Sequence, residues 1–187
     1  LVQRVLDMGV DTVFLQAFAD PKGDGLARSL YFPNRHLPMR ADLFNRVAWQ
    51  LRSRAEVKVF AWLPVLGYEL PDPALRQALA IRSSNPAETF RLDPFQPETR
   101  RIVGEIYEDL AANSYTEGLL FHDDALLRED ELGDTAPGDP AARTQALIDF
   151  THELHRAAGI WRPKLTTVRN LFAQPVLQPH SEAWFAQ

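Results

Sequence analysis

The sequence contains no cysteine among its 187 residues. This absence excludes disulfides, thiolate zinc sites and a cysteine nucleophile within the chain. Long apolar runs are also missing, since none approaches the roughly 20 residues that a membrane-spanning helix needs. The chain does not open on a basic stretch followed by an apolar one, so we expect any export signal to lie outside it. Acidic residues outnumber basic ones and give the chain a net charge of -5. This charge argues against nucleic-acid binding, because phosphates require a basic surface.

Apolar residues make up 45% of the sequence and charged residues 24%, a balance typical of globular domains. The length fits one domain or a large piece of one. Residues 1–8 have helical spacing with no capping residue before them, and residues 181–187 stop inside another helical pattern. We therefore expect residues 1–187 to form a single but incomplete domain.

Short apolar runs alternate with segments of helical periodicity along the chain. The apolar runs predict strands buried on both faces, at residues 12–18, 57–62, 118–122 and 164–169. The periodic segments predict helices, at residues 1–8, 41–54, 98–113 and 141–158. Strands joined by helical crossovers form parallel sheets, so the sequence predicts an α/β fold.

The loops distinguish between an open parallel sheet and a barrel. No glycine-rich phosphate turn follows the first expected strand, which weakens the nucleotide-binding open sheet. Long loops rich in aromatic and polar residues follow the strands, as in (β/α)₈ barrels whose sites lie at the strand carboxyl ends. We therefore predict a partial (β/α)₈ barrel of about four βα units, with its last strands outside the chain.

Two adjacent carboxylates, Asp123 and Asp124, follow the third expected strand directly. Their side chains point in different directions, so one can face the barrel axis while the other contacts a neighbouring loop. Repulsion and burial raise the pKa of one member of such a pair, as a general acid requires. His122, just before them, is a candidate to tune the pair. The alternative is that the two carboxylates cap a helix or hold a loop.

Further polar residues follow the first two strands. Glu69 is a candidate to face Asp123 or Asp124 across the barrel mouth, because glycosidic cleavage usually needs paired carboxylates. A solvated loop glutamate is the competing interpretation. Gln16 and Asp20, at the end of the first expected strand and just past it, are further candidates to bind substrate. Residues 20–25 resemble a calcium loop superficially, but they lack a third ligand and the distal glutamate.

Aromatic residues gather at strand ends and in the following loops, where they can stack on the apolar faces of sugar rings. Trp62 is the best candidate because it ends its strand, and Tyr68 follows in the next loop. Four more residues are predicted to complete a polar ring at the mouth: Arg35, His36, Arg169 and Asn170. No G-x-S-x-G or H-E-x-x-H motif occurs, and we expect neither a metal nor a cofactor.

Six blocks of the sequence carry a family resemblance: FLQAFAD at 14–20, YFPNRHLPM at 31–39, RVAWQL at 46–51, AWLPV at 61–65, LLFHDDA at 119–125 and EAWFAQ at 182–187. They resemble the carboxyl-terminal domain of the poly-β-1,6-N-acetyl-D-glucosamine N-deacetylases, biofilm exopolysaccharide proteins of the Gram-negative periplasm. The segment from 130 to 140 is shorter than the resemblance leads us to expect.

The resemblance implies a glycoside-hydrolase-like barrel that binds partly deacetylated poly-β-1,6-N-acetyl-D-glucosamine and cleaves it endolytically. It places Asp123 and Asp124 in the site and leaves the proton donor open, with Asp124 favoured. It also implies a metal-dependent deacetylase domain outside this chain, and a periplasmic, outer-membrane-anchored protein that works with an export porin. The alternative function is a non-catalytic module that holds the polymer during deacetylation and export.

Overall fold

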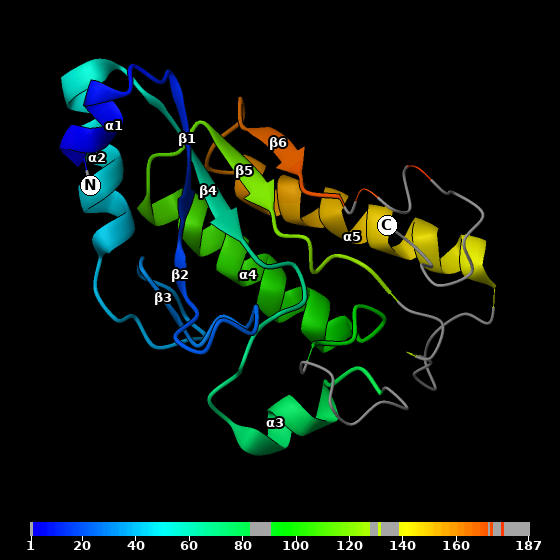
Figure 1. Ribbon diagram of the computed structural model, residues 1–187. Helices are drawn as coiled ribbons and strands as arrows, with labels where there is room; N and C mark the ends of the chain where they lie inside the picture. Colours follow the sequence, from blue (N-terminus) through cyan, green and yellow to red (C-terminus); the bar gives the residue numbers. More distant parts are fainter. Residues whose placement is uncertain are drawn as a thin grey trace.

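A parallel four-stranded sheet forms the centre of the computed structural model, which describes residues 2–82, 91–127, 131, 139–171, 173 and 177. The strands are β1 (Thr12–Gln16), β4 (Lys58–Leu63), β5 (Gly118–Phe121) and β6 (Thr166–Arg169), in the order β1-β4-β5-β6. All three pairings are parallel, so the four carboxyl ends meet at one edge (Figure 1). This confirms the predicted α/β sheet.

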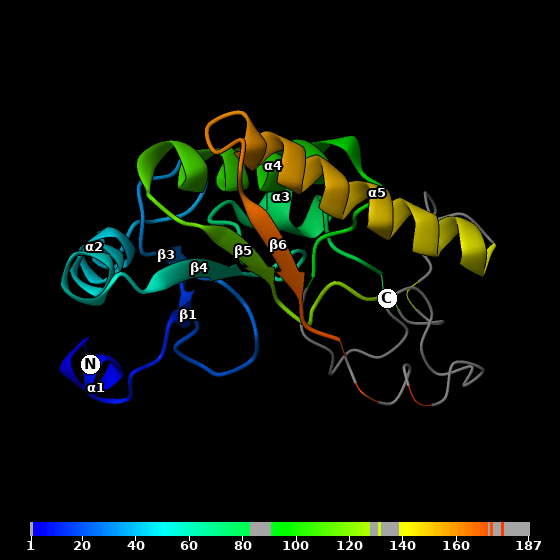
Figure 2. The ribbon, with the colours of Figure 1, turned by 90° about the horizontal axis from the view of Figure 1, so that it is seen from above.

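Helices connect these strands, as the periodicity predicts. They are α1 (Val2–Asp7), α2 (Leu43–Ala55), α3 (Pro73–Ala78), α4 (Pro97–Asn113) and α5 (Pro140–Gly159). Helices α4 and α5 pack against each other on the same side of β5 and β6 (Figure 2). Helix α2 packs on β1 and β4, and α1 packs on α2. None of the helices within the described ranges is long and apolar enough to cross a membrane.

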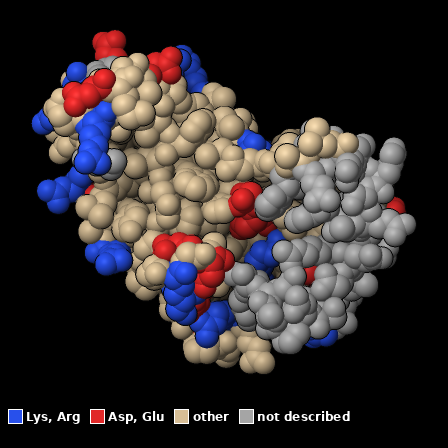
Figure 3. Space-filling view, in the orientation of Figure 1, with Lys and Arg blue, Asp and Glu red and all other residues tan. Residues whose placement is uncertain are grey.

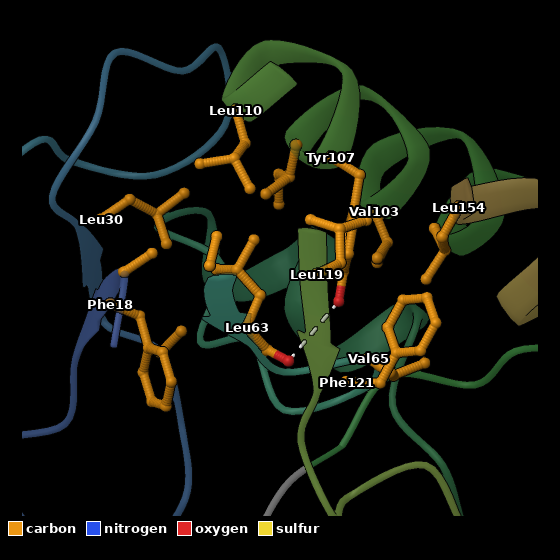
Figure 4. Packing of buried hydrophobic residues seen from close by; sticks show 14 of the residues in the cluster. Phe18, Leu30, Leu63, Val65, Val103, Tyr107, Leu110, Leu119, Phe121 and Leu154 are labelled. Carbon is orange, nitrogen blue, oxygen red and sulfur yellow. Dashed lines mark hydrogen bonds between the residues drawn. The ribbon is translucent and has the colours of Figure 1, made fainter. Parts of the chain in front are cut away.

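The main core lies between the sheet and α4. Leu63 and Phe121 point from neighbouring strands toward the helix, where the ring of Phe121 lies 5.7 Å from that of Tyr107 (Figure 4). Leu119 and Leu110 are fully buried in the same cluster. Successive strand residues point to opposite faces. The residues between these therefore face the other side of the sheet, which is the inner side of a barrel.

The inner side carries rows of side chains in register. Gln16, Trp62, Leu120 and Val168 are aligned across the four strands and form one such row. The row below begins with Phe14 and Phe60, whose rings meet edge to face at 5.4 Å. Layers of this kind fill the interior of (β/α)₈ barrels.

The prediction that every strand is buried on both faces is wrong for the outer strands. All four residues of β5 are buried, but β1 and β6 are only partly covered, and Phe14 is 47% exposed. The reason is position, because β1 and β6 are the edge strands of this sheet. A residue on an edge strand lacks the cover that a second neighbouring strand provides.

Two short features lie in segments predicted as loops. The first expected strand ends at Gln16, and Phe18–Ala19 forms β2, which pairs antiparallel with β3 (Ser29–Leu30). Helix α3 begins at Pro73 after Asp72, whose carboxylate accepts hydrogen bonds from the N–H groups of Ala74 and Leu75. An aspartate cap followed by a first-turn proline is a recognised helix start.

Candidate functional site

The carboxyl end of β5 leads into an aromatic cluster on the inner side of the sheet. His122 follows Phe121, and its ring lies 5.2 Å from Trp62 and 5.9 Å from Phe18. Phe18 and Trp62 meet edge to face at 6.2 Å. Three segments far apart in sequence thus bring their rings together where the predicted site lies. Phe18 was not among the predicted site residues, although its place just after the first strand is the signal that could have found it.

Asp123 is half-exposed beside this cluster, with 41% of its side chain accessible. Its carboxylate contacts Nδ1 of His122, and its backbone N–H donates a hydrogen bond to the same nitrogen at 2.7 Å. The lone pair of Nδ1 accepts the backbone N–H, and the imidazole lies directly beside the carboxylate.

Asp124 lies in a different environment from its neighbour. Its carboxylate accepts hydrogen bonds from the backbone N–H groups of Val65, Leu66 and Gly67, at 2.9, 2.6 and 2.6 Å. Gly67 is required here, because a Cβ would lie 2.7 Å from the carbonyl oxygen of Gly25 and 3.2 Å from Asp124. Asp124 thus fastens the loop after β5 to the turn after β4.

The same turn is held from the core side by two tyrosines. The hydroxyl groups of Tyr68 and Tyr107 donate hydrogen bonds to the carbonyl oxygen of Pro64, at 2.5 and 3.0 Å. Both side chains are fully buried, and burial raises the pKa of each phenol well above its ordinary value. The prediction that Tyr68 binds substrate is therefore wrong, because its side chain lies inside the core.

Glu69 does not face the aspartate pair. Its carboxylate pairs with Arg28 at 2.7 Å and Arg76 at 3.3 Å. Arg28 also bonds to Asp24 at 2.6 Å, and this guanidinium lowers the pKa of Asp24 to about 2. Asp20 accepts hydrogen bonds from three backbone N–H groups of its own loop and pairs with Arg28. Glu69 and Asp20, predicted to lie in the site, instead form part of an ion-pair and hydrogen-bond network that holds the loop after β2.

Arg35 and His36 also lie away from the aspartate pair. Arg35 pairs with Glu108 at 2.7 Å and with Asp109 at 3.0 Å, and His36 bonds to Glu105 at 2.6 Å. All three partners belong to α4, on the helical side of the sheet. The predicted polar ring therefore loses these two members, which fasten the loop after β3 to α4.

The remaining predicted residues divide between the two sides of the sheet. Gln16 is exposed in the row of Trp62, and Asn170 is exposed two residues beyond Val168, which ends that row on β6. Arg169 is in register with Phe121 on the helical side, and its Nη2 donates to the carbonyl oxygen of Ala125 at 2.5 Å. The prediction that Arg169 contacts substrate is therefore not supported by its position.

A cavity of about 500 Å³ lies at the opposite end of the sheet, near the amino ends of β4, β5 and β6. Tyr115 and Trp161 line it, together with Arg162. Arg52 and Arg162 both lie against the ring of Tyr115, at 3.4 and 4.7 Å from its centroid. Active sites of (β/α)₈ barrels lie at the carboxyl ends of the strands, so this cavity is at the other end from the candidate site.

Comparison with known proteins places the chain among carbohydrate-active domains. A family described as hypothetical glycosyl hydrolase family 13 matches residues 1–139 and 133–187. The poly-β-1,6-N-acetyl-D-glucosamine N-deacetylase of Escherichia coli strain K12 is 45% identical over 219 aligned positions, covering 100% of this chain and 32% of that protein. The chain therefore spans about a third of the length of this curated relative.

Solved structures agree with the sequence comparison. The glycoside hydrolase domain of PgaB (BpsB) from Bordetella bronchiseptica superimposes with a TM-score of 0.91 at 42% identity, covering 100% of this chain and 62% of that one. The α-L-fucosidase isoenzyme 2 of Paenibacillus thiaminolyticus, at 16% identity, has a TM-score of 0.68 over 90% of this chain and shows the fold alone. These neighbours confirm a partial (β/α)₈ barrel. Because the two matched segments, 1–139 and 133–187, together span the chain, the chain belongs to hypothetical glycosyl hydrolase family 13.

Proposed function

We propose that the chain is part of a glycoside hydrolase domain that binds and cleaves partly deacetylated poly-β-1,6-N-acetyl-D-glucosamine. The observation that carries this proposal is the arrangement at the end of β5, where half-exposed Asp123 contacts His122, whose ring lies 5.2 Å from that of Trp62. An acid group beside an aromatic surface suits a glycosidic bond, because the ring holds the sugar while the acid protonates the leaving oxygen. The name of the curated relative supplies the polymer, and that of the solved structure supplies the reaction class.

Asp123 is the proposed proton donor, in place of Asp124, which the sequence favoured. A general acid must reach the leaving oxygen of the substrate with its own proton. Both carboxylate oxygens of Asp124 already accept backbone hydrogen bonds from the turn after β4. Asp123 makes none of these backbone contacts, and 41% of its side chain is exposed beside His122.

Substrate contacts are proposed on the inner side of the sheet. Trp62 and His122 offer tilted ring faces to a sugar, while Gln16 and Asn170 flank them at the ends of β1 and β6. Deacetylated residues of the polymer carry amino groups, which are cations at neutral pH. A net charge of -5 favours such a polymer, and salt should weaken binding by screening that attraction.

The setting of the whole protein is a separate proposal that follows the named relatives. We propose that the chain belongs to a periplasmic polysaccharide N-deacetylase, anchored to the outer membrane and working with an export porin. Deacetylation is assigned to a part of the protein outside this chain, because the curated relative is about three times as long.

Cleavage of a defined polymer tests the proposal. The full-length protein, its Asp123→Asn variant and an Asp149→Asn control are incubated with partly deacetylated poly-β-1,6-N-acetyl-D-glucosamine, and chain length is followed by mass spectrometry. Asp149 is an exposed carboxylate on the outer face of α5. We expect Asp123→Asn to cleave the polymer at least about 100-fold more slowly than the parent, because general acids contribute that much to the rate. Asp149→Asn should cleave at the parental rate. Binding without shortening by the parent would instead support a non-catalytic module.

A further inference from the structure

The peptide segment that follows Asp123 is held by two arginines. Nη1 of Arg91 donates hydrogen bonds to the carbonyl oxygens of Asp124 and Leu126, at 3.0 and 2.7 Å. Nη2 of Arg169 donates to the carbonyl oxygen of Ala125, between them, at 2.5 Å. Three successive carbonyl groups in a segment without regular secondary structure thus accept hydrogen bonds from guanidinium groups.

The two arginines reach this segment from opposite parts of the chain. Arg91 precedes α4, and its side chain is only 10% exposed. Its Nη2 also pairs with the buried carboxylate of Glu131, so Arg91 ties residues 124–126 to residue 131. Arg169 ends β6, points to the helical side of the sheet, and is largely withdrawn from solvent, which lowers its pKa.

The segment is restrained on its other side by Asp124. Its carboxylate accepts the N–H groups of residues 65–67, so the backbone carbonyls and the side chain of one short loop are fixed to three different elements. Asp123 is the first residue of this loop and takes no part in these contacts. Ordering a loop this heavily costs conformational entropy, which the hydrogen bonds and ion pairs must offset.

We propose that Arg91 and Arg169 are positioning residues for Asp123, a role that rests on the proposed function of that carboxylate. They set the path of residues 124–126 and thereby the direction in which Asp123 meets the glycosidic oxygen. A lysine cannot replace either of them fully, because a guanidinium is a planar fork with several fixed donors and an ammonium is a point charge. Displacing a reacting group by about 1 Å can cost about 100-fold in rate.

Arg91→Lys and Arg169→Lys in the full-length protein test this role, with Arg162→Lys as the matched control. Arg162 also donates to backbone carbonyls, those of Ala111 and Ser114, but at the other end of the sheet. Steady-state cleavage of synthetic β-1,6-linked glucosamine and N-acetylglucosamine oligomers gives kcat and KM for each folded variant. We expect kcat to fall about 10- to 100-fold in both test variants with KM changed less than about twofold, and both constants to be unchanged in the control.

The outcomes separate this inference from the proposed function. If Asp123→Asn cleaves as fast as the parent, the proposed function fails. If Asp123→Asn is inactive while both lysine variants keep the parental kcat, or the control loses as much kcat as they do, the positioning role fails alone. Loss of folded protein in both lysine variants would also overturn it, because the arginines are proposed to set geometry and not to permit folding.

Discussion

Replacing Asp124 by asparagine should destabilise the protein far more than the same change at Asp123. An asparagine has one acceptor oxygen where the carboxylate has two, and its amide group would face a backbone N–H of the turn. The turn residues Val65, Leu66 and Gly67 are fully buried or nearly so, so an unpaired N–H among them is costly.

The size of the effect follows from these contacts. One buried N–H without an acceptor costs about 2 kcal/mol, and loss of the charge weakens the other two bonds by about 1 kcal/mol together. A change of about 3 kcal/mol lowers the Tm of a domain of this size by roughly 6–12 °C. Asp123 is half-exposed and contacts His122, so Asp123→Asn should stay within about 2 °C of the parent.

Scanning calorimetry of the two full-length variants measures this difference, with polymer cleavage measured in parallel. The expected pattern is a split, in which Asp124→Asn loses stability and Asp123→Asn loses activity at parental stability. Equal melting temperatures for the two variants would refute the assignment of Asp124 to the turn. A thermally unchanged Asp124→Asn protein without activity would instead make Asp124 the acid.

Three other predictions follow from single side chains. Trp62→Ala should raise the Kd for the polymer about tenfold, as measured by calorimetric titration. An unchanged Kd would show that the Trp62 ring does not bind sugar. Tyr68→Phe should lower the free energy of unfolding by about 1 kcal/mol, because the hydrogen bond to Pro64 is lost, without changing the Kd for the polymer. Weaker polymer binding would instead support a substrate contact by Tyr68. Asp24→Asn should lower the free energy of unfolding at pH 7 by about 1 kcal/mol, because Arg28 holds the pKa of Asp24 at about 2. The lowered pKa stabilises the folded protein fully above the unfolded value of 3.8, so the difference should shrink as pH falls below about 4 and vanish below about 2. A difference that stays undiminished below about pH 2 would contradict it.

The strands and long helices could be predicted because each depends on local pattern. The run at 118–121 is apolar throughout, and all of it is buried in β5. Helix α3 was missed although Asp72 and Pro73 signal its start, because six residues are too few for a periodic pattern. The exposure of β1 could not be predicted, since it depends on which strand lies at the edge.

The position of the aspartate pair at a strand end was predictable, but the contacts of each carboxylate were not. Strand ends of a parallel sheet meet at one edge, so the position of Asp123 and Asp124 followed from the run before them. Which of the two faces a ligand depends on a turn more than fifty residues earlier, whose N–H groups bind Asp124. Glu69 was predicted to face the pair, but its partner Arg28 lies in another loop and no local signal links them.

The hydrogen bonds from Arg91 and Arg169 to the loop after β5 could not be predicted from the sequence either. Arg91 is an isolated arginine in a segment that the sequence describes only as loop, and nothing near it predicts its carbonyl partners. Arg169 was predicted at the mouth because it ends a strand, but strand alternation places it on the side of Phe121. Contacts between residues distant in sequence decided both roles.

A crystal structure of the full-length Asp123→Asn protein with a bound β-1,6-linked glucosamine oligomer would test the central claim most directly. We predict that the side chain of residue 123 lies within hydrogen-bonding distance of a glycosidic oxygen, about 2.6–3.2 Å, beside the ring of Trp62. Asp124 should still accept the N–H groups of residues 65–67. A glycosidic oxygen against Asp124, or an oligomer bound away from His122, would contradict the assignment.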